Sequence, residues 1–280
     1  MTTPSPAGPT SPRASCDDAA TRAGSTEGPA VGRLWLIPNG LDLGTGVEVP
    51  LCDVLPRGVI TQAAALGHWV VENAKTARAF LKRVGAVVPL ARPLQSIDIR
   101  ELPRHGKGRA SSSPAELAAL LAPALDGQDI GLLSEAGLPA VADPGAGLVL
   151  AAHECGVHVV PLSGPSSLML ALAASGLNGQ SFAFVGYLPV DASARQSRVR
   201  ELEQVSRRLG QTQMAIETPY RNAALFKALT EGLSADTLLC VARGLTLPGG
   251  CVDTRAVKDW RERPVMLDDR TPAVFLWLAR

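Results

Sequence analysis

The residues best suited to binding a ligand lie between Leu132 and Gly147, where the sequence reads LLSEAGLPAVADPGAG. We call residues 134–147 the central loop. It consists mainly of Gly, Pro and Ala and carries only two carboxylates, Glu135 and Asp143. Glycine lets backbone approach a ligand closely, and a loop after a strand can point its N–H groups at a polar molecule. The stretch is too interrupted for a helix and too long for a simple turn, so it indicates a binding loop.

Two further loops rich in Gly or Pro follow predicted strands, over residues 38–46 and 163–167. In parallel α/β sheets, ligands bind beyond the carboxyl ends of the strands, so these loops and the central loop are expected to converge. The glycine spacings of dinucleotide-binding and P-loop motifs do not occur, which argues against those two modes of phosphate binding. The pattern favours a nucleotide-sized, mostly neutral ligand. The alternative is that the three loops only connect strands to helices and bind nothing.

Hydrolytic and metal chemistry have no positive support in the sequence. No GxSxG nucleophile motif is present, and the serines of the loops have no neighbouring His. Glu135 and Asp143 lie too far apart in the sequence to be assigned as a catalytic pair. The five Cys and four His form no pattern typical of a metal site, and we interpret the Cys as reduced thiols of a cytosolic protein. No metal is predicted.

Strands and helices alternate from residue 31 to about residue 165, which predicts a mostly parallel sheet with helices on its faces. The first strand is expected over Val31–Ile37. A helix is expected to begin after Asn73 as its N-cap and to end at Gly85, a residue type common just beyond a helix. Residues 91–112 are polar and predict a solvated loop, or alternatively a basic loop that contacts substrate.

Capping signals mark the later helices. Ser113 is a predicted N-cap, with Pro114 in the first turn and Glu116 three residues after the cap. A strongly charged helix is predicted to end at Gly210. Another helix is predicted to be capped by Thr218.

The fold class is therefore α/β. We place a domain boundary after residue 162, which gives an N-terminal α/β domain over 31–162 and a C-terminal α/β domain over 163–280. Residues 1–30 are rich in Pro, Ser, Thr, Ala and Gly and predict a disordered tail.

Composition and charge narrow the class of protein. The 280 residues are 46% hydrophobic and carry a net charge of +1, which suits a globular protein with a large core. Near-neutral charge argues against coating nucleic acid by bulk electrostatics, although a local basic patch remains open. No apolar run reaches the about 18 residues of a membrane span, and the amino-terminal stretch lacks the apolar core of a secretory signal. We therefore expect a cytoplasmic protein.

Three segments resemble a known family: LLSEAGLPAVADPGAGLV, VHVVPLSGPSSLMLALAASGL and SFAFVGYLP. They are similar to the S-adenosylmethionine-dependent tetrapyrrole methylase superfamily, and within it to the ribosomal RNA small subunit methyltransferase I branch. IETPYR, DASARQSRVRELE and GRLWLIPNGLDLG extend the resemblance, in the same order, over residues 32–280.

The resemblance implies two α/β domains with S-adenosylmethionine in a cleft between them, and a homodimer. It places the cofactor against backbone of the central loop, the Gly-Pro-Ser turn and segments of the second domain. The residues that it assigns to the cofactor are Pro38, Ala136, Gly137, Leu138, Pro139, Val141, Ser166, Ser167, Glu217, Thr218 and Gly244.

The sequence departs from the branch at the residues expected near the substrate. The branch has an AEDTR-like stretch where this chain has VENAKTAR. Asn73 stands where an acidic residue is expected, and Asn cannot take up a proton at neutral pH. Glu72 is the candidate to replace it. Lys75 and Arg78 could contact phosphate or stabilise a developing alkoxide, and otherwise form a solvated helix face.

The leading hypothesis is a methyltransferase for ribosomal RNA of the small subunit, acting at a ribose 2′-oxygen. A charged helix would contact phosphates, or form an ordinary salt-bridged surface. Its basic residues are Arg195, Arg198, Arg200, Arg207 and Arg208. The alternatives are a methyltransferase for a small molecule such as a tetrapyrrole, and an S-adenosylmethionine-binding protein that has lost catalysis.

Overall fold

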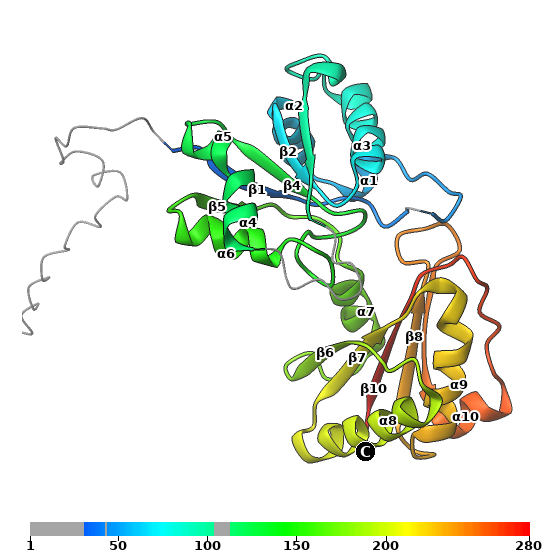
Figure 1. Cartoon of the computed structure of the whole chain (residues 1–280). Helices are drawn as coiled ribbons and strands as arrows, with labels where there is room; N and C mark the ends of the chain where they lie inside the picture. Colours follow the sequence, from blue (N-terminus) through cyan, green and yellow to red (C-terminus); the bar gives the residue numbers. More distant parts are fainter. Residues whose placement is uncertain (1–30, 43, 104–112) are drawn as a thin grey trace, which may run out of the picture. The chain divides into compact units, whose positions relative to one another are not determined.

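The structure is a computed structural model that describes residues 31–42, 44–103 and 113–280 (Figure 1). It has a mixed α/β fold with two five-stranded sheets, in agreement with the predicted α/β class. The predicted tail over residues 1–30 lies outside the described residues. In the part that the structure describes, helices are either too short or too polar to cross a membrane.

All strands of the first sheet run parallel, in the order β3-β2-β4-β1-β5. The carboxyl ends of these strands therefore meet at one edge, and the loops after β1, β2, β4 and β5 start there. The strands are β1 (Arg33–Ile37), β2 (His68–Val71), β3 (Asp98–Glu101), β4 (Ile130–Leu133) and β5 (His158–Pro161).

Alternate residues of these strands pack into two separate cores, as the two-residue period of a strand requires. Ile37 and Leu133 pack with one group of helices, whereas Leu34 and Leu132 pack with another. The first group is α1 (Leu51–Val54), α2 (Arg57–Ala65) and α3 (Ala74–Val87). The second is α4 (Pro114–Leu120), α5 (Ala122–Leu125) and α6 (Ala146–Glu154).

Two sequence-based expectations about this half are wrong. Helix α3 does not end at Gly85 but continues to Val87, and a Cβ on Gly85 would lie 3.3 Å from Leu90. This glycine therefore makes room for a side chain instead of ending the helix. The predicted loop over 91–112 is described only as far as residue 103, and this part is not simply a loop, because it includes η1 (Leu94–Ser96) and the edge strand β3; residues 104–112 lie outside the described residues. Charged residues are common on edge strands, which hid this strand among polar residues.

The second sheet has the order β6-β7-β10-β8-β9; β6 and β7 run parallel and the other neighbours run antiparallel. Its strands are β6 (Phe182–Tyr187), β7 (Thr212–Ile216), β8 (Leu238–Arg243), β9 (Cys251–Ala256) and β10 (Ala273–Leu278). Helix α7 (Ser167–Ser175) packs on one face of this sheet through Leu168 and Leu172. The core on the other face includes residues of α8 (Ala192–Leu209), α9 (Asn222–Gly232) and α10 (Val257–Glu262).

The caps account for several helix ends. Ser113 and Glu116 form the predicted capping box, and Gly210 ends α8 in the left-handed conformation. Thr218, in contrast, does not cap α9. It precedes the short helix η2 (Pro219–Arg221), and α9 begins only at Asn222. The domain boundary after residue 162 stays a prediction.

Gly131 shows why one position of β4 must be glycine. It is the register partner of Trp69 on one side and of Trp35 on the other. A Cβ at Gly131 would lie 2.8 Å from the Trp69 ring and 2.9 Å from Leu66. The indole of Trp69 therefore packs directly over the backbone of Gly131. A side chain at this position would displace the indole.

We predict that Gly131→Val lowers the free energy of unfolding by about 1–3 kcal/mol, because overpacking outweighs the higher strand propensity of Val. Urea unfolding measures the change. Gly179→Val is the matched control, since a Cβ on Gly179 meets no atom within 4 Å. Equal stability of Gly131→Val and the wild type would contradict the packing argument.

Candidate functional site

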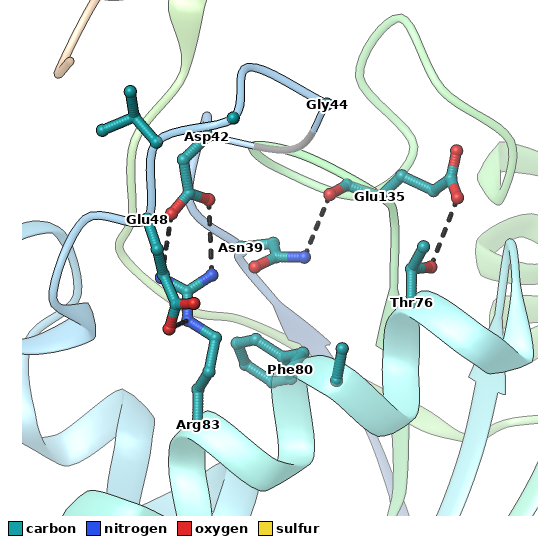
Figure 2. A pocket seen from close by; sticks show the side chains of 11 residues that line it. Asn39, Asp42, Gly44, Glu48, Thr76, Phe80, Arg83 and Glu135 are labelled. Carbon is teal, nitrogen blue, oxygen red and sulfur yellow. Dashed lines mark hydrogen bonds and ion pairs between the residues drawn. The ribbon is translucent and has the colours of Figure 1, made fainter.

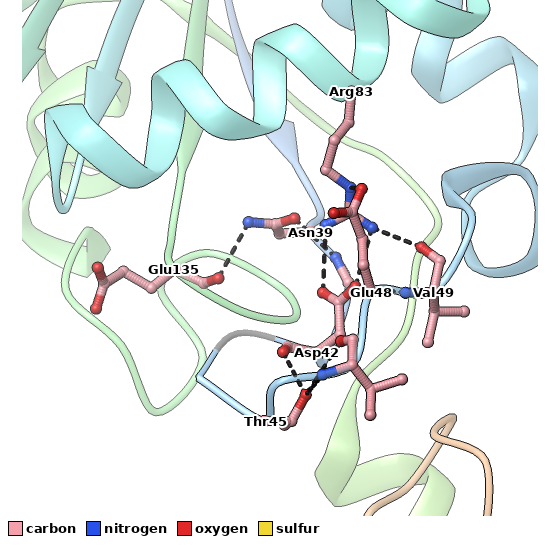
Figure 3. A network of polar contacts seen from close by, with 9 residues as sticks. Asn39, Asp42, Thr45, Glu48, Val49, Arg83 and Glu135 are labelled. Atoms are coloured by element: carbon pink, nitrogen blue, oxygen red, sulfur yellow. Dashed lines mark hydrogen bonds and ion pairs between the residues drawn. The ribbon is translucent and has the colours of Figure 1, made fainter.

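Asn39 joins the first loop to the central loop (Figure 3). Its side-chain amide donates to the carbonyl oxygens of Glu135 at 3.0 Å and Ser134 at 3.3 Å. Its backbone N–H donates to the carbonyl of Gly137 at 2.9 Å, and its side-chain oxygen accepts from Gly40 at 2.8 Å. Asn39 is 7% exposed. The sequence did not single it out, because its partners lie about 95 positions away.

The central loop has an unusual backbone. Gly137 and Gly145 have positive φ, and so do Ala140 at 65° and Ala142 at 64°. A left-handed alanine costs roughly 1–2 kcal/mol, so the surrounding contacts must impose this path. The residues that the resemblance assigns to the cofactor in this loop are Ala136, Gly137, Leu138, Pro139 and Val141, and all lie on this constrained segment.

The first and third loops also meet. A Cβ on Gly164 would lie 2.2 Å from the Cβ of Pro38, so only glycine lets these segments approach so closely. On the central loop, a Cβ on Gly137 would lie 3.5 Å from the carbonyl oxygen of Pro165. The three Gly/Pro-rich loops thus converge, as their positions after parallel strands predicted. Ser166 is buried beside them and Ser167 begins α7.

Three carboxylates gather at this edge of the first sheet. The backbone N–H of Glu135 donates to Glu72 Oε2 at 3.1 Å. Burial, and after it the negative charges of Glu72 and Glu135, together raise the pKa of Asp143 from its ordinary value of 3.8 to about 7. From the sequence alone, Glu135 and Asp143 could not be assigned as a catalytic pair. Sequence spacing hides this cluster, which forms only when β2 and β4 lie side by side.

Asn73 has a structural role that explains the residue type. Its side-chain oxygen accepts hydrogen bonds from the backbone N–H groups of Lys75 at 2.9 Å and Thr76 at 3.4 Å, which caps α3. Asn is among the best N-cap residues. Lys75 and Arg78 lie exposed on the first turns of α3, and Arg78 donates back to the carbonyl of Ala74 at 3.3 Å.

The remaining predicted cofactor residues lie at one end of the second sheet. Glu217 and Thr218 follow β7 and Gly244 follows β8, next to the start of β10. The Glu217 side chain is 4% exposed and forms an ion pair with Arg221 at 3.0 Å. Gly244 has φ +58°, a conformation that favours glycine.

Two buried polar atoms test whether these segments fit a ligand such as S-adenosylmethionine. Ser134 Oγ and Asn222 Oδ1 have no hydrogen-bond partner among the described residues. Ser134 opens the central loop, and Asn222 closely follows Glu217 and Thr218. Buried polar groups are normally paired, so an unpaired one next to a binding segment fits a site that a polar ligand or its bound water completes.

The raised pKa of Asp143 leads to a prediction about stability. A carboxyl with a raised pKa in the folded state ionises more easily in the unfolded chain, so the protein loses stability as pH rises from about 4 to about 7. We predict that Asp143→Asn raises Tm relative to the wild type, and that the gain grows between pH 4 and pH 7.

Thermal unfolding at a series of pH values measures this gain, with the exposed Asp269→Asn as the matched control. A gain for Asp143→Asn that does not change with pH would show that burial and the neighbouring carboxylates do not raise the pKa of Asp143.

The comparisons with known proteins show what the chain is similar to. No protein-family model matches the chain. The chain is 34% identical over 196 residues to the ribosomal RNA small subunit methyltransferase I of Mesorhizobium japonicum, a match that covers 70% of this chain and 60% of the relative. The protein of the same name from Vibrio cholerae is 39% identical over 122 residues, or 44% of this chain and 41% of the relative. The chain thus spans about 60% or less of the length of these relatives.

Solved structures show the fold. The crystal structure of the methyltransferase CobJ superposes with a TM-score of 0.53 at 18% identity, covering 89% of this chain and 94% of that one. The structure of the conserved hypothetical protein APE0931 from Aeropyrum pernix K1 superposes with a TM-score of 0.56 at 17% identity. The match covers 89% of this chain and 85% of that chain. The resemblance inferred from the sequence is confirmed: this chain shares the fold of the methyltransferase CobJ and is similar in sequence to the proteins named ribosomal RNA small subunit methyltransferase I.

Proposed function

We propose that this chain is an S-adenosylmethionine-dependent methyltransferase that acts on ribosomal RNA, at a ribose 2′-oxygen of the small subunit. The observation that carries the proposal is the 34% identity over 196 residues to a protein of that name. The convergence of three constrained loops at the carboxyl edge of a parallel sheet supports it, because such edges bind ligands.

The chain's own residues would mainly position the two reactants. S-adenosylmethionine, when bound, supplies a methyl group that is already activated by the sulfonium. The central loop from Ala136 to Val141 would lie against it, with Pro38 and the segment at Ser166 and Ser167 beside this loop. Glu217, Thr218 and Gly244 would border another part of the molecule.

A hydroxyl acceptor must also lose a proton. Asn73 cannot accept it, and its side-chain oxygen already caps α3. Glu72 was the candidate from sequence, and its Oε2 accepts a hydrogen bond from the central loop. Asp143 is the better candidate for a proton acceptor near neutral pH, since its pKa of about 7 leaves it partly ionised there.

Contact with RNA phosphates would use only part of the predicted basic helix. Arg195 donates to the carbonyls of Pro189 and Val190, and Arg207 donates to the carbonyl of Arg280. Arg198 forms an ion pair with Glu201 at 2.7 Å. The remaining two, Arg200 and Arg208, are exposed and have no ion-pair partner among the described residues.

The alternatives keep weaker support. Structural likeness to CobJ at 18% identity extends to the fold alone, so it does not favour a tetrapyrrole substrate. Loss of catalysis was suggested by Asn73, but the carboxyl of Asp143, close to Glu72 and Glu135, offers another proton acceptor. A homodimer is part of the proposal, and apolar side chains on the edge strand β6 suit it: Phe182 is 40% exposed and Phe184 is 36% exposed.

We predict that the purified protein transfers labelled methyl from S-adenosylmethionine to small-subunit RNA when ribosomal subunits, total RNA and a small-metabolite extract are offered in parallel. Label only in the metabolite extract would support a small-molecule substrate. Binding of S-adenosylmethionine without any transfer would support the protein that has lost catalysis.

Gly137→Trp is expected to abolish cofactor binding in calorimetric titration, because the indole would fill the space beside Leu41 and Pro165. Gly179→Trp is the control, since Gly179 is exposed and a Cβ there meets nothing within 4 Å. Absence of cofactor binding to the wild type would overturn the proposed function.

A further inference from the structure

The two tyrosines of the chain, Tyr187 and Tyr220, are its most exposed aromatic side chains, at 59% and 71%. In the residues that the structure describes, neither hydroxyl has a hydrogen-bond partner and neither ring contacts another aromatic ring. Tyrosine supplies a large apolar contact surface with a polar tip, so two bare rings that lie close together mark a place where another molecule binds.

Both rings belong to one edge of the second sheet. Strands β6 and β7 run parallel, so their carboxyl ends meet, and Tyr187 at the end of β6 is the register partner of Ile216 at the end of β7. Tyr220 follows Ile216 after a short stretch of chain, in η2. That stretch contains Glu217 and Thr218, which the proposed function assigns to the cofactor.

A bulge in β6 sets the direction of Tyr187. The three steps from Phe184 to Tyr187 match only two steps along β7, and the bulge includes Gly186 at φ +71°. On a regular strand Tyr187 would share the face of Val185, which packs against the core on the α8 side of the sheet. The extra residue turns Tyr187 to the opposite face, where it is exposed. Bulges often re-aim a side chain next to an active site.

The surroundings of Tyr187 are acidic. Burial, and after it the negative charges of Asp143, Glu217 and Glu72, raise the pKa of Tyr187. Tyr187 is therefore within electrostatic reach of Asp143, the proton acceptor of the proposed function. A group that binds on this ring lies beside the reacting atoms.

Phosphate does not suit this place, because the arginines that border these loops already have partners. Arg83 pairs with Asp42 at 2.9 Å and with Glu48 at 3.3 Å (Figure 2). Arg221 pairs with Glu217 at 3.0 Å. Nearby carboxylates repel an anion as well. The part of an RNA acceptor that lies here must be uncharged, and the flat, uncharged part of a nucleotide is its base.

We propose that Tyr187 and Tyr220 bind unpaired bases of the RNA acceptor by stacking, with the base of the reacting nucleotide on Tyr187. Proteins that read single-stranded RNA splay out its bases and stack them on aromatic rings. The proposal rests on the proposed function, since it assigns the acceptor side of the same site. Lys75 and Arg78, exposed at the start of α3, remain for the neighbouring phosphates.

Binding of small-subunit ribosomal RNA to the full chain tests the stacking, with calorimetric titration of S-adenosylmethionine in parallel. Tyr187→Ala and Tyr220→Ala should each weaken RNA binding roughly tenfold, which lies within the range for one base stacked on an aromatic ring. Tyr187→Phe and Tyr220→Phe should bind RNA like the wild type, because the face of the ring and not the hydroxyl makes the stack. Cofactor affinity should stay unchanged in all four variants.

The salt dependence separates stacking from phosphate contacts. A stack carries no charge, so the alanine variants should keep the wild-type slope of log affinity against log salt, whereas Lys75→Gln should reduce that slope by about 1. Met266→Ala is the matched control for loss of an exposed apolar side chain, since Met266 is 90% exposed, and it should bind RNA like the wild type.

Three results would overturn the proposal while leaving the proposed function intact. They are wild-type RNA affinity in both alanine variants, an equal loss in the phenylalanine and alanine variants, and a loss that comes with a changed salt slope. Unchanged RNA affinity together with a changed oligomeric state would assign the rings to a contact between copies of the chain. A wild-type protein that binds S-adenosylmethionine but neither binds nor methylates small-subunit RNA would overturn the proposed function, and the stacking with it.

Discussion

The side-chain amide of Asn39 is the contact on which the candidate site depends. It reaches from the end of β1 to carbonyls of the central loop, about 95 positions along the chain. Because Asn39 is 7% exposed, those carbonyls would be left unpaired in a dry environment without it. Further along the same loop, Ala140 and Ala142 are left-handed, and strain of this kind persists only where neighbouring contacts impose it.

Electrostatics adds a second constraint at the same edge. Parallel strands bring Glu72, Glu135 and Asp143 together, and the first loop adds Asp42, which Arg83 neutralises. A concentration of carboxylates repels phosphate, so an RNA acceptor would have to present a neutral or cationic part here and place its phosphates elsewhere. This follows from the proposed function.

Much of the fold could be predicted from local patterns: the alternation of strands and helices, the capping box at Ser113 and the C-terminal glycine of α8. Local patterns failed where tertiary packing decides. Gly85 makes room for Leu90 inside α3 instead of ending it, and β3 is an edge strand among charged residues. The central loop was found from its composition. Asn39 and the Glu135–Asp143 cluster were not, since both arise from pairing between segments that are distant in the sequence.

The most direct test is calorimetric titration of S-adenosylmethionine into Asn39→Ala, compared with the wild type and with Asn178→Ala, an Asn whose amide bonds lie at the second sheet. If Asn39 holds the two loops as one binding surface, its variant should lose roughly tenfold or more in affinity, the scale of one or two buried hydrogen bonds, while Asn178→Ala keeps wild-type affinity. Unchanged affinity in a folded Asn39→Ala would contradict the account.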